Sequence, residues 1–161
     1  QKIDESACSI ACLQETKCEI IDQCFIRKCC PWCFDQFIRV PSSGASGGLL
    51  VVWNTALFAG KLIESNNFGI VVEFTSVHNS QTWTLVTVYG PCQNPARDNF
   101  INWLHDIIIP DDANWLLLGD FNFMLTMDNR NKPGGDINDM FIFNEVIGHL
   151  GLIELPLKGR K

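Results

Sequence analysis

Between residues 49 and 89, runs of apolar and β-branched residues follow one another with only short polar turns between them. The runs are rich in Val, Ile, Leu, Phe and Thr, which favour pleated strands, and they cover residues 49–53, 57–64, 69–77 and 82–89. Consecutive strands joined by short turns pair antiparallel, because a parallel pair needs a long crossover connection. This part of the sequence therefore predicts an antiparallel sheet.

Further strands and helices are predicted on both sides of this region. Residues 9–13, 34–39 and 114–119 form short apolar runs typical of buried strands, and residues 18–30 are compatible with a helix. With no internal repeat and no low-complexity tract, the sequence favours one α/β domain over residues 1–161.

The clearest helix is predicted for residues 95–109, with Asn94 as the N-cap and Pro95 at the first helical position. Its inward stripe would consist of Phe100, Ile101, Leu104, Ile107 and Ile108. A second helix is predicted for residues 138–150. Its inward residues would be Met140, Phe141, Phe143, Ile147 and Leu150.

The charge of the chain limits how it could hold nucleic acid. The net charge is -6, and binding through phosphate neutralisation alone requires clustered Lys and Arg. An enzyme that holds a divalent cation with carboxylates avoids this objection, because the cation supplies positive charge at the scissile phosphate. No apolar run is long enough to span a membrane. We expect an intracellular protein.

Seven of the eight cysteines lie within the first 33 residues. Cys30 and Cys33 have the spacing of a thioredoxin-like redox site, but such a site lies between a strand and a following helix, and here the predicted order is reversed. A zinc site formed by Cys8, Cys12, Cys30 and Cys33 is the second alternative. The favoured interpretation is that the cysteines are small buried thiols.

Residues able to carry chemistry follow two predicted strands. Asp120 and Asn122 follow an apolar strand, and strand alternation would place both on one side with Phe121 turned into the core. Glu15 follows the first strand. Because ligands of α/β sheets bind outside strand ends, Glu15 and Asp120 could share one pocket. One carboxylate could bind a hard cation such as Mg²⁺ while the other removes a proton from an attacking water.

A structural interpretation of the same residues remains open. Gly-Asp turns commonly follow strands, Asp and Asn cap turns, and exposed glutamates are mostly solvated. Tyr89, the only tyrosine, could place its hydroxyl on a phosphate or simply hydrate the end of a core aromatic ring.

Four segments, in this order, resemble the successive boxes of the DNase I-like (endonuclease/exonuclease/phosphatase) superfamily. They are residues 12–17 (CLQETK), 47–53 (GGLLVVW), 88–91 (VYGP) and 118–122 (LGDFN). The VYGP box, the helix after it and residues 128–130 are similar to the endonuclease domain of plant LINE-type non-LTR retrotransposons. The resemblance implies a four-layer sandwich of two mainly antiparallel sheets flanked by helices.

The resemblance also implies roles for individual residues. Glu15 would bind Mg²⁺ or Mn²⁺, with Gln14 and Lys17 supporting the site. Tyr89 would stabilise the phosphate, Asp120 would be the base, and Asn122 would hold both Asp120 and the scissile phosphate. The implied activity is DNA nicking that leaves a 3' hydroxyl for a reverse transcriptase in the same polyprotein, in the nucleus. Arg130 and Lys132 are candidate DNA contacts, or members of a solvated loop.

Two boxes of the family are not found in the chain: an N-terminal strand that carries Asn, and a Ser-Asp-His box. We therefore expect a domain truncated at both ends, with little nuclease activity on its own. The alternatives are another phosphodiesterase or phosphatase of this fold, acting on inositol polyphosphates, sphingomyelin or RNA, or a non-enzymatic remnant.

Overall fold

The computed structural model describes residues 8–42, 47–126 and 137–155. The chain forms two compact units. The first comprises residues 1–90 and 111–121, and the second comprises residues 91–110 and 122–161. Each unit is described by itself.

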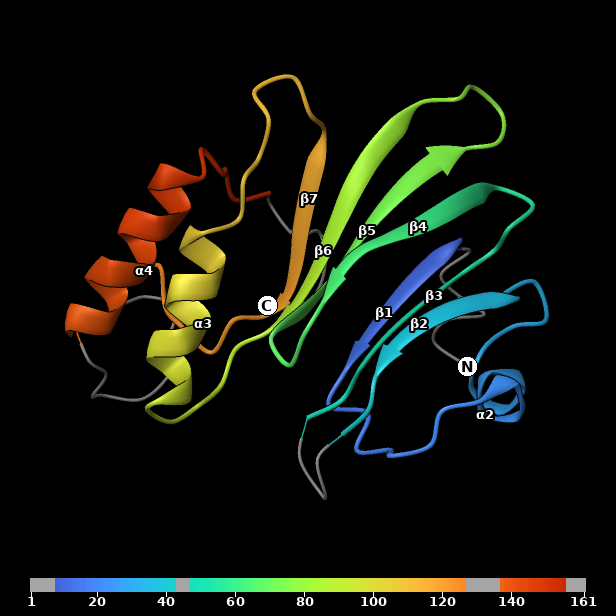
Figure 1. The fold of residues 1–161 in the computed structure, drawn as a ribbon, viewed down its shortest axis with the longest axis horizontal. Helices are drawn as coiled ribbons and strands as arrows, with labels where there is room; N and C mark the ends of the chain where they lie inside the picture. The colour runs from blue at the N-terminus through green and yellow to red at the C-terminus, as the bar shows by residue number, and fades with distance from the viewer. Residues whose placement is uncertain (1–7, 43–46, 127–136, 156–161) are drawn as a thin grey trace. The chain divides into compact units, whose positions relative to one another are not determined.

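The first unit contains two sheets (Figure 1). Three strands form an antiparallel sheet in the order β1-β3-β2: β1 (Ile10–Gln14), β3 (Leu49–Trp53) and β2 (Gln36–Val40). Four strands form the other sheet in the order β4-β5-β6-β7: β4 (Phe58–Ser65), β5 (Gly69–Ser76), β6 (Thr82–Tyr89) and β7 (Trp115–Asp120). Strands β4, β5 and β6 are antiparallel, whereas β7 lies parallel to β6.

Strand β3 is buried on both faces, which explains its uninterrupted apolar sequence. Leu49, Val51 and Trp53 pack between the two sheets, against a cluster that includes Phe74. Leu50 and Val52 point to the other face and pack with Ile26 of α2 (Gln23–Cys29). The first unit therefore has a helix, a sheet and a second sheet packed in succession.

Helix α2 is shorter than the 18–30 range that is compatible with a helix. Asp22 caps it, accepting a 2.8 Å hydrogen bond from the backbone N–H of Phe25, and the helix ends before Cys30. Strand β2 begins at Gln36, two residues later than predicted, because the backbone N–H of Phe34 donates to the carbonyl of Pro31 in a turn.

The second unit contains α3 (Ala96–His105) and α4 (Ile137–His149). The prediction of Asn94 as N-cap is wrong: Pro95 occupies the cap position, no side chain caps the helix, and the Asn94–Pro95 peptide bond is cis. Helix α3 also ends at His105 rather than at residue 109. The helical period therefore does not extend to Ile108, which was predicted to point inward and is 85% exposed.

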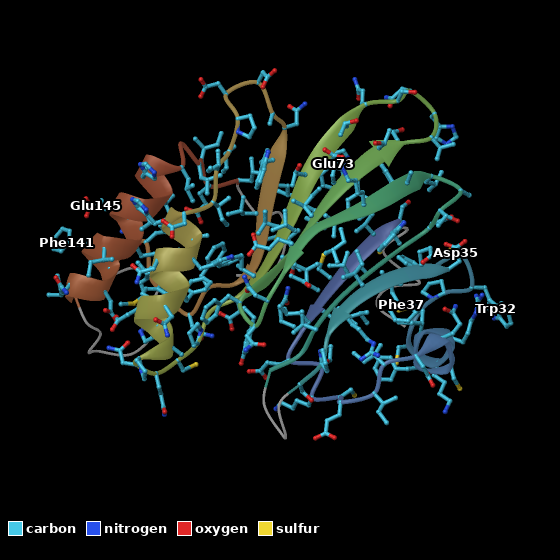
Figure 2. All side chains as sticks on the ribbon, viewed as in Figure 1. Trp32, Asp35, Phe37, Glu73, Phe141 and Glu145 are labelled. Atoms are coloured by element: carbon cyan, nitrogen blue, oxygen red, sulfur yellow. The ribbon has the colours of Figure 1, made fainter. Side chains whose placement is uncertain are left out.

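Helix α4 buries Phe143 and Val146, but Phe141 is 64% exposed and projects from its outer face (Figure 2). The prediction that Phe141 points inward is wrong for a geometric reason. Residues two positions apart on a helix lie about 200° apart around its axis, so Phe141 and Phe143 cannot share one face. The rings of Phe100 and Phe143 each stack on Phe123, with centroids 5.9 and 5.2 Å away.

The elements confirm the predicted fold class, an α+β protein with two mainly antiparallel sheets and flanking helices. Within the described ranges, no helix is both long and apolar enough to cross a membrane.

The cysteines only partly follow the buried-thiol prediction. Cys30 is buried and Cys12 is partly buried against the core between the sheets, but four others are exposed: Cys24, Cys29, Cys33 and Cys92. All eight lie within the described residues, and none of them forms a disulfide. The Cys30–Cys33 segment follows a helix and precedes a strand, the reverse of the thioredoxin order. No three His, Cys, Asp or Glu side chains of the described ranges group as metal ligands.

We expect Cys12 to react far more slowly than the four exposed cysteines. Burial raises the pKa of the Cys12 thiol to about 11, against a smaller opposing effect of its hydrogen bond with Thr87. Only about 0.1% of such a thiol is ionised at pH 8, and the thiolate is the reactive form. Timed maleimide labelling with peptide mass spectrometry should show Cys12 at least about 100-fold slower, and equal labelling in guanidinium would attribute the difference to the fold.

Candidate active site

The carboxyl ends of three strands lie at the same border of the first unit. Strand β1 ends at Gln14, β6 ends at Tyr89, and β7 ends at Asp120. Tyr89 and Asp120 are register partners in the parallel β6–β7 pair, and β1 contacts both of these strands. The structure therefore brings together residues that lie up to about 100 positions apart in the sequence.

Glu15 lies directly beyond β1 and is held from two sides. The Tyr89 hydroxyl donates a 2.5 Å hydrogen bond to Oε1, and the Lys17 ammonium lies 3.6 Å from Oε2. The Tyr89 hydrogen bond, and next the charge of Lys17, lower the pKa of the Glu15 carboxyl below its usual value. Glu15 is therefore a solvent-exposed carboxylate that is kept ionised.

The backbone around Glu15 is strained. Glu15 and Lys17 have φ angles of 50° and 53°, in the left-handed region that residues with a Cβ seldom adopt. Each such residue costs roughly 1–2 kcal/mol. Strain of this kind is retained where the surrounding contacts determine the conformation, as happens at functional sites.

Gln14 supports the site by joining the two sheets. Its side-chain amide donates a 3.0 Å hydrogen bond to the hydroxyl of Thr87, which is fully buried in β6. The end of β1 is thereby fixed to the strand that carries Tyr89. The hydrogen bond identifies Thr87 as a residue that the sequence did not single out.

Two glycines allow the ends of β6 and β7 to approach each other. A Cβ on Gly119, where φ is 141°, would lie 2.0 Å from the carbonyl oxygen of Val88. A Cβ on Gly90 would lie 1.8 Å from the carbonyl oxygen of Phe121. The backbone N–H of Gly90 donates a 2.7 Å hydrogen bond to the carbonyl of Asp120, which has an exposed side chain.

Asn122 does not continue the strand alternation that was predicted from Asp120. Strand β7 ends at Asp120, and Asn122 has a left-handed φ of 52°. Alternation applies only to extended backbone, so it does not determine the direction of the Asn122 side chain. Asn122 belongs to the second unit, where its carbonyl accepts a 2.8 Å hydrogen bond from Arg97.

Arg97 is a further residue that the sequence analysis missed. Its guanidinium forms a 2.7 Å ion pair with Asp139 and lies 3.8 Å from the centroid of the Phe123 ring. It therefore fixes the chain that follows β7. A signal was present in the sequence: a cation in the first turn of a helix opposes the helix dipole, so Arg97 requires another partner.

Both predicted nucleic-acid contacts, Arg130 and Lys132, lie outside the described residues. A surface groove elsewhere in the first unit, lined by edge strands β2 and β4, contains none of the predicted site residues.

Glu15 has the type of side chain that Mg²⁺ binds in proteins, and it would supply one ligand. Mg²⁺ prefers oxygen ligands, uses one or two protein carboxylates and keeps several waters. The ionised, half-exposed Glu15 carboxylate fits such an ion. Lys17 could exchange for the ion at little cost, because an ion pair this exposed contributes little to stability.

We expect Tyr89→Phe to raise the pKa of Glu15. The substitution keeps the ring and removes the hydrogen bond that contributes most to the lowered pKa. A lowered pKa favours folding at pH values above the unfolded value of 4.5, and this contribution is lost as the pH falls through the folded pKa. NMR titration of the Glu15 side-chain carboxyl carbon would measure the change.

Lys17→Met is the comparison variant, because it removes the charge and the hydrogen bond of Lys17 and should also raise the Glu15 pKa. An unchanged Glu15 pKa in Tyr89→Phe would show that the Tyr89 hydrogen bond does not lower the pKa of this carboxyl.

Comparison with known protein structures identifies the fold of the chain. The catalytic domain of human Nocturnin with a bound sulfate anion superposes with a TM-score of 0.56 over 79% of the chain, at 16% sequence identity. The fold is DNase I-like. At this identity the likeness establishes the fold alone, and the chain spans 56% of the Nocturnin structure.

A second similarity comes from sequence. Over 79 residues, or 48% of its length, the chain is 29% identical to the transposon TX1 uncharacterized 149 kDa protein of Xenopus laevis. The aligned segment is only 6% of that protein. No protein-family profile matches the chain.

Proposed function

We propose that the chain carries catalytic residues of a metal-dependent phosphodiesterase that nicks DNA for a retrotransposon. The observation that carries the proposal is the juxtaposition of Glu15, Tyr89 and Asp120 at the ends of three strands. The similarity to a transposon protein supports a transposon context, and the DNase I-like fold agrees with the family that the four sequence segments resemble. The nuclear location and the covalently linked reverse transcriptase belong to the same proposal.

Each residue has a role in the proposed reaction. Glu15 would hold a Mg²⁺ or Mn²⁺ ion, which when bound supplies positive charge to the phosphate oxygens. Asp120, exposed at the end of β7, would accept a proton from the attacking water. With an ion in their place at Glu15, the Tyr89 hydroxyl and the Lys17 ammonium would turn to the negative charge that develops on the phosphate. Asn122, two residues after Asp120, would orient the base and the phosphate.

The test is a nicking assay on the longest natural reading frame that contains this chain. Conversion of supercoiled plasmid to open circles in Mg²⁺, lost in EDTA and absent in Glu15→Gln, is the expected result. RNA, inositol polyphosphates and sphingomyelin belong in the same assay, because the fold does not determine the substrate. Hydrolysis of one of these in place of DNA would reassign the substrate, and no hydrolysis of any would favour a non-enzymatic remnant.

Metal binding can be tested separately from catalysis. Mn²⁺ is paramagnetic, so a bound ion should broaden the NMR signals of Glu15 and Tyr89 at lower Mn²⁺ concentrations than those of Asp35. Asp35 is a carboxylate of another turn of the unit, where it accepts hydrogen bonds from Thr55. Equal broadening at Asp35 and Glu15 would mean non-specific binding and would argue against a metal site at Glu15.

A further inference from the structure

The strained turn that carries Glu15 is fastened to a glycine pair at the start of β3. The backbone N–H of Thr16 donates a 3.2 Å hydrogen bond to the carbonyl of Gly48, and that of Lys17 donates a 3.1 Å bond to the carbonyl of Gly47. Thr16 lies between the two residues with left-handed φ angles. Its position therefore determines the direction in which the chain presents Glu15.

The side chain of Thr16 occupies the space above the α-carbon of Gly48. A Cβ on Gly48 would lie only 2.2 Å from Thr16 Oγ1, and 3.4 Å from the Cβ of Ser42. A Cβ atom essentially never has a non-bonded neighbour closer than 3.0 Å, so only a glycine fits beneath Thr16 in this arrangement. The contact is a steric fit that involves one specific side chain.

The fit does not depend on a hydrogen bond of the Thr16 hydroxyl. Thr16 Oγ1 is buried and has no hydrogen-bond partner among the described residues, and the same is true of Ser42 Oγ nearby. A buried hydroxyl without a partner is unfavourable by about 1–3 kcal/mol, so hydrogen bonding does not explain why the side chain lies here. Its shape does: the side chain fills the gap between the Glu15 turn and Gly48.

We propose that Thr16 and Gly48 act as a latch that positions the Glu15 carboxylate toward Tyr89. Thr16 is thus a positioning residue, because it acts on the site through Glu15. The catalytic importance of the latch rests on the proposed function. Its effect on Glu15 does not, since the Tyr89 hydrogen bond and the contact between Thr16 and Gly48 exist whether or not the protein hydrolyses a phosphodiester.

The test is the NMR titration of Glu15 in a set of variants. Gly48→Ala should displace Thr16, weaken the Tyr89 hydrogen bond and move the Glu15 pKa up toward its ordinary value of 4.5. Gly47→Ala is the matched control: Gly47 also has a positive φ, of 76°, but nothing lies within 4 Å of its added Cβ. The control should leave the titration of Glu15 unchanged.

Two further comparisons separate a steric latch from general destabilisation. The double variant Thr16→Ala with Gly48→Ala removes the colliding Oγ1 and places the methyl group added at position 48 in the space that Oγ1 occupied. Its Glu15 titration should therefore lie closer to that of the original chain than the titration of Gly48→Ala does. If Gly48→Ala does not fold, Thr16→Ala and Thr16→Val decide the matter. The valine keeps the shape of the side chain and should leave the Glu15 pKa unchanged, whereas the alanine should raise it.

The proposal is overturned if Gly48→Ala folds with an unchanged Glu15 titration, if Gly47→Ala shifts it equally, or if Thr16→Val shifts it as much as Thr16→Ala. We also expect the affinity for Mn²⁺ to fall about tenfold in Gly48→Ala, because the Glu15 carboxylate is displaced from the position in which it would bind the ion. A Glu15 shift without plasmid nicking in the original protein would support the latch and count against the proposed activity, so the two failures are distinguishable.

Discussion

Replacing Asp120 with asparagine is expected to lower phosphodiester hydrolysis by about two to four orders of magnitude in a protein that spans the complete site. The substitution keeps the size of the side chain and the backbone carbonyl that accepts the 2.7 Å hydrogen bond from Gly90, but it removes the group that can accept a proton. Single-turnover rates at saturating metal would measure the loss, which should fall on kcat.

Asp35→Asn is the matched control for this experiment. Asp35 is also a carboxylate of the first unit, but its oxygens accept hydrogen bonds from the backbone N–H and the hydroxyl of Thr55 in a turn. Its replacement should leave kcat unchanged while loosening that turn. If Asp120→Asn retained the original rate, Asp120 would not be the base, and the proposed mechanism would be wrong at its central step.

Gly119→Ala is expected to reduce the free energy of unfolding by more than about 3 kcal/mol, or to prevent folding. The added Cβ would meet the backbone carbonyl of Val88 at 2.0 Å, and the φ of 141° is unfavourable for any residue with a Cβ. A backbone atom paired within a sheet cannot move aside as the end of a side chain can. Denaturant titration followed by circular dichroism would measure the change.

The comparison variant is Gly148→Ala, for which the opposite sign is expected. Gly148 lies in α4, and nothing lies within 4 Å of its added Cβ. Alanine should stabilise the helix by about 0.5–1 kcal/mol, since glycine is the weaker helix former. Similar losses of stability in both variants would mean that the close approach of β6 and β7 is not what requires Gly119.

Strands that pack in the core could be placed from the sequence, because a strand that is buried on both faces has an uninterrupted apolar sequence. Strand β3 was predicted at its observed bounds, since Leu49 to Trp53 are all buried and apolar. The helix ends were less predictable. Asn94 has a good capping side chain, but the backbone at Pro95 takes the cap position, and no local pattern reveals this.

Part of the site could also be predicted from the sequence. Placing Glu15 and Asp120 near a shared strand border required only the rule that ligands bind at strand ends, together with the family resemblance. The contacts that position Glu15 depend on tertiary geometry: the Tyr89 hydroxyl is 74 residues away, and Gly48 is brought next to Thr16 by the β1–β3 pairing. Sequence spacing carries no information about such distances, which is why Thr87 and the role of Gly48 were missed.

The distribution of the site over β1, β6 and β7 has a consequence for the protein during its synthesis. Glu15 is translated first, and Tyr89 and Asp120 follow it on later strands. At ordinary rates of translation, about 5 to 20 seconds pass between the synthesis of Glu15 and that of Asp120. A nascent chain cannot assemble these three residues before β7 has been made, so a chain whose translation stops earlier lacks part of the candidate site.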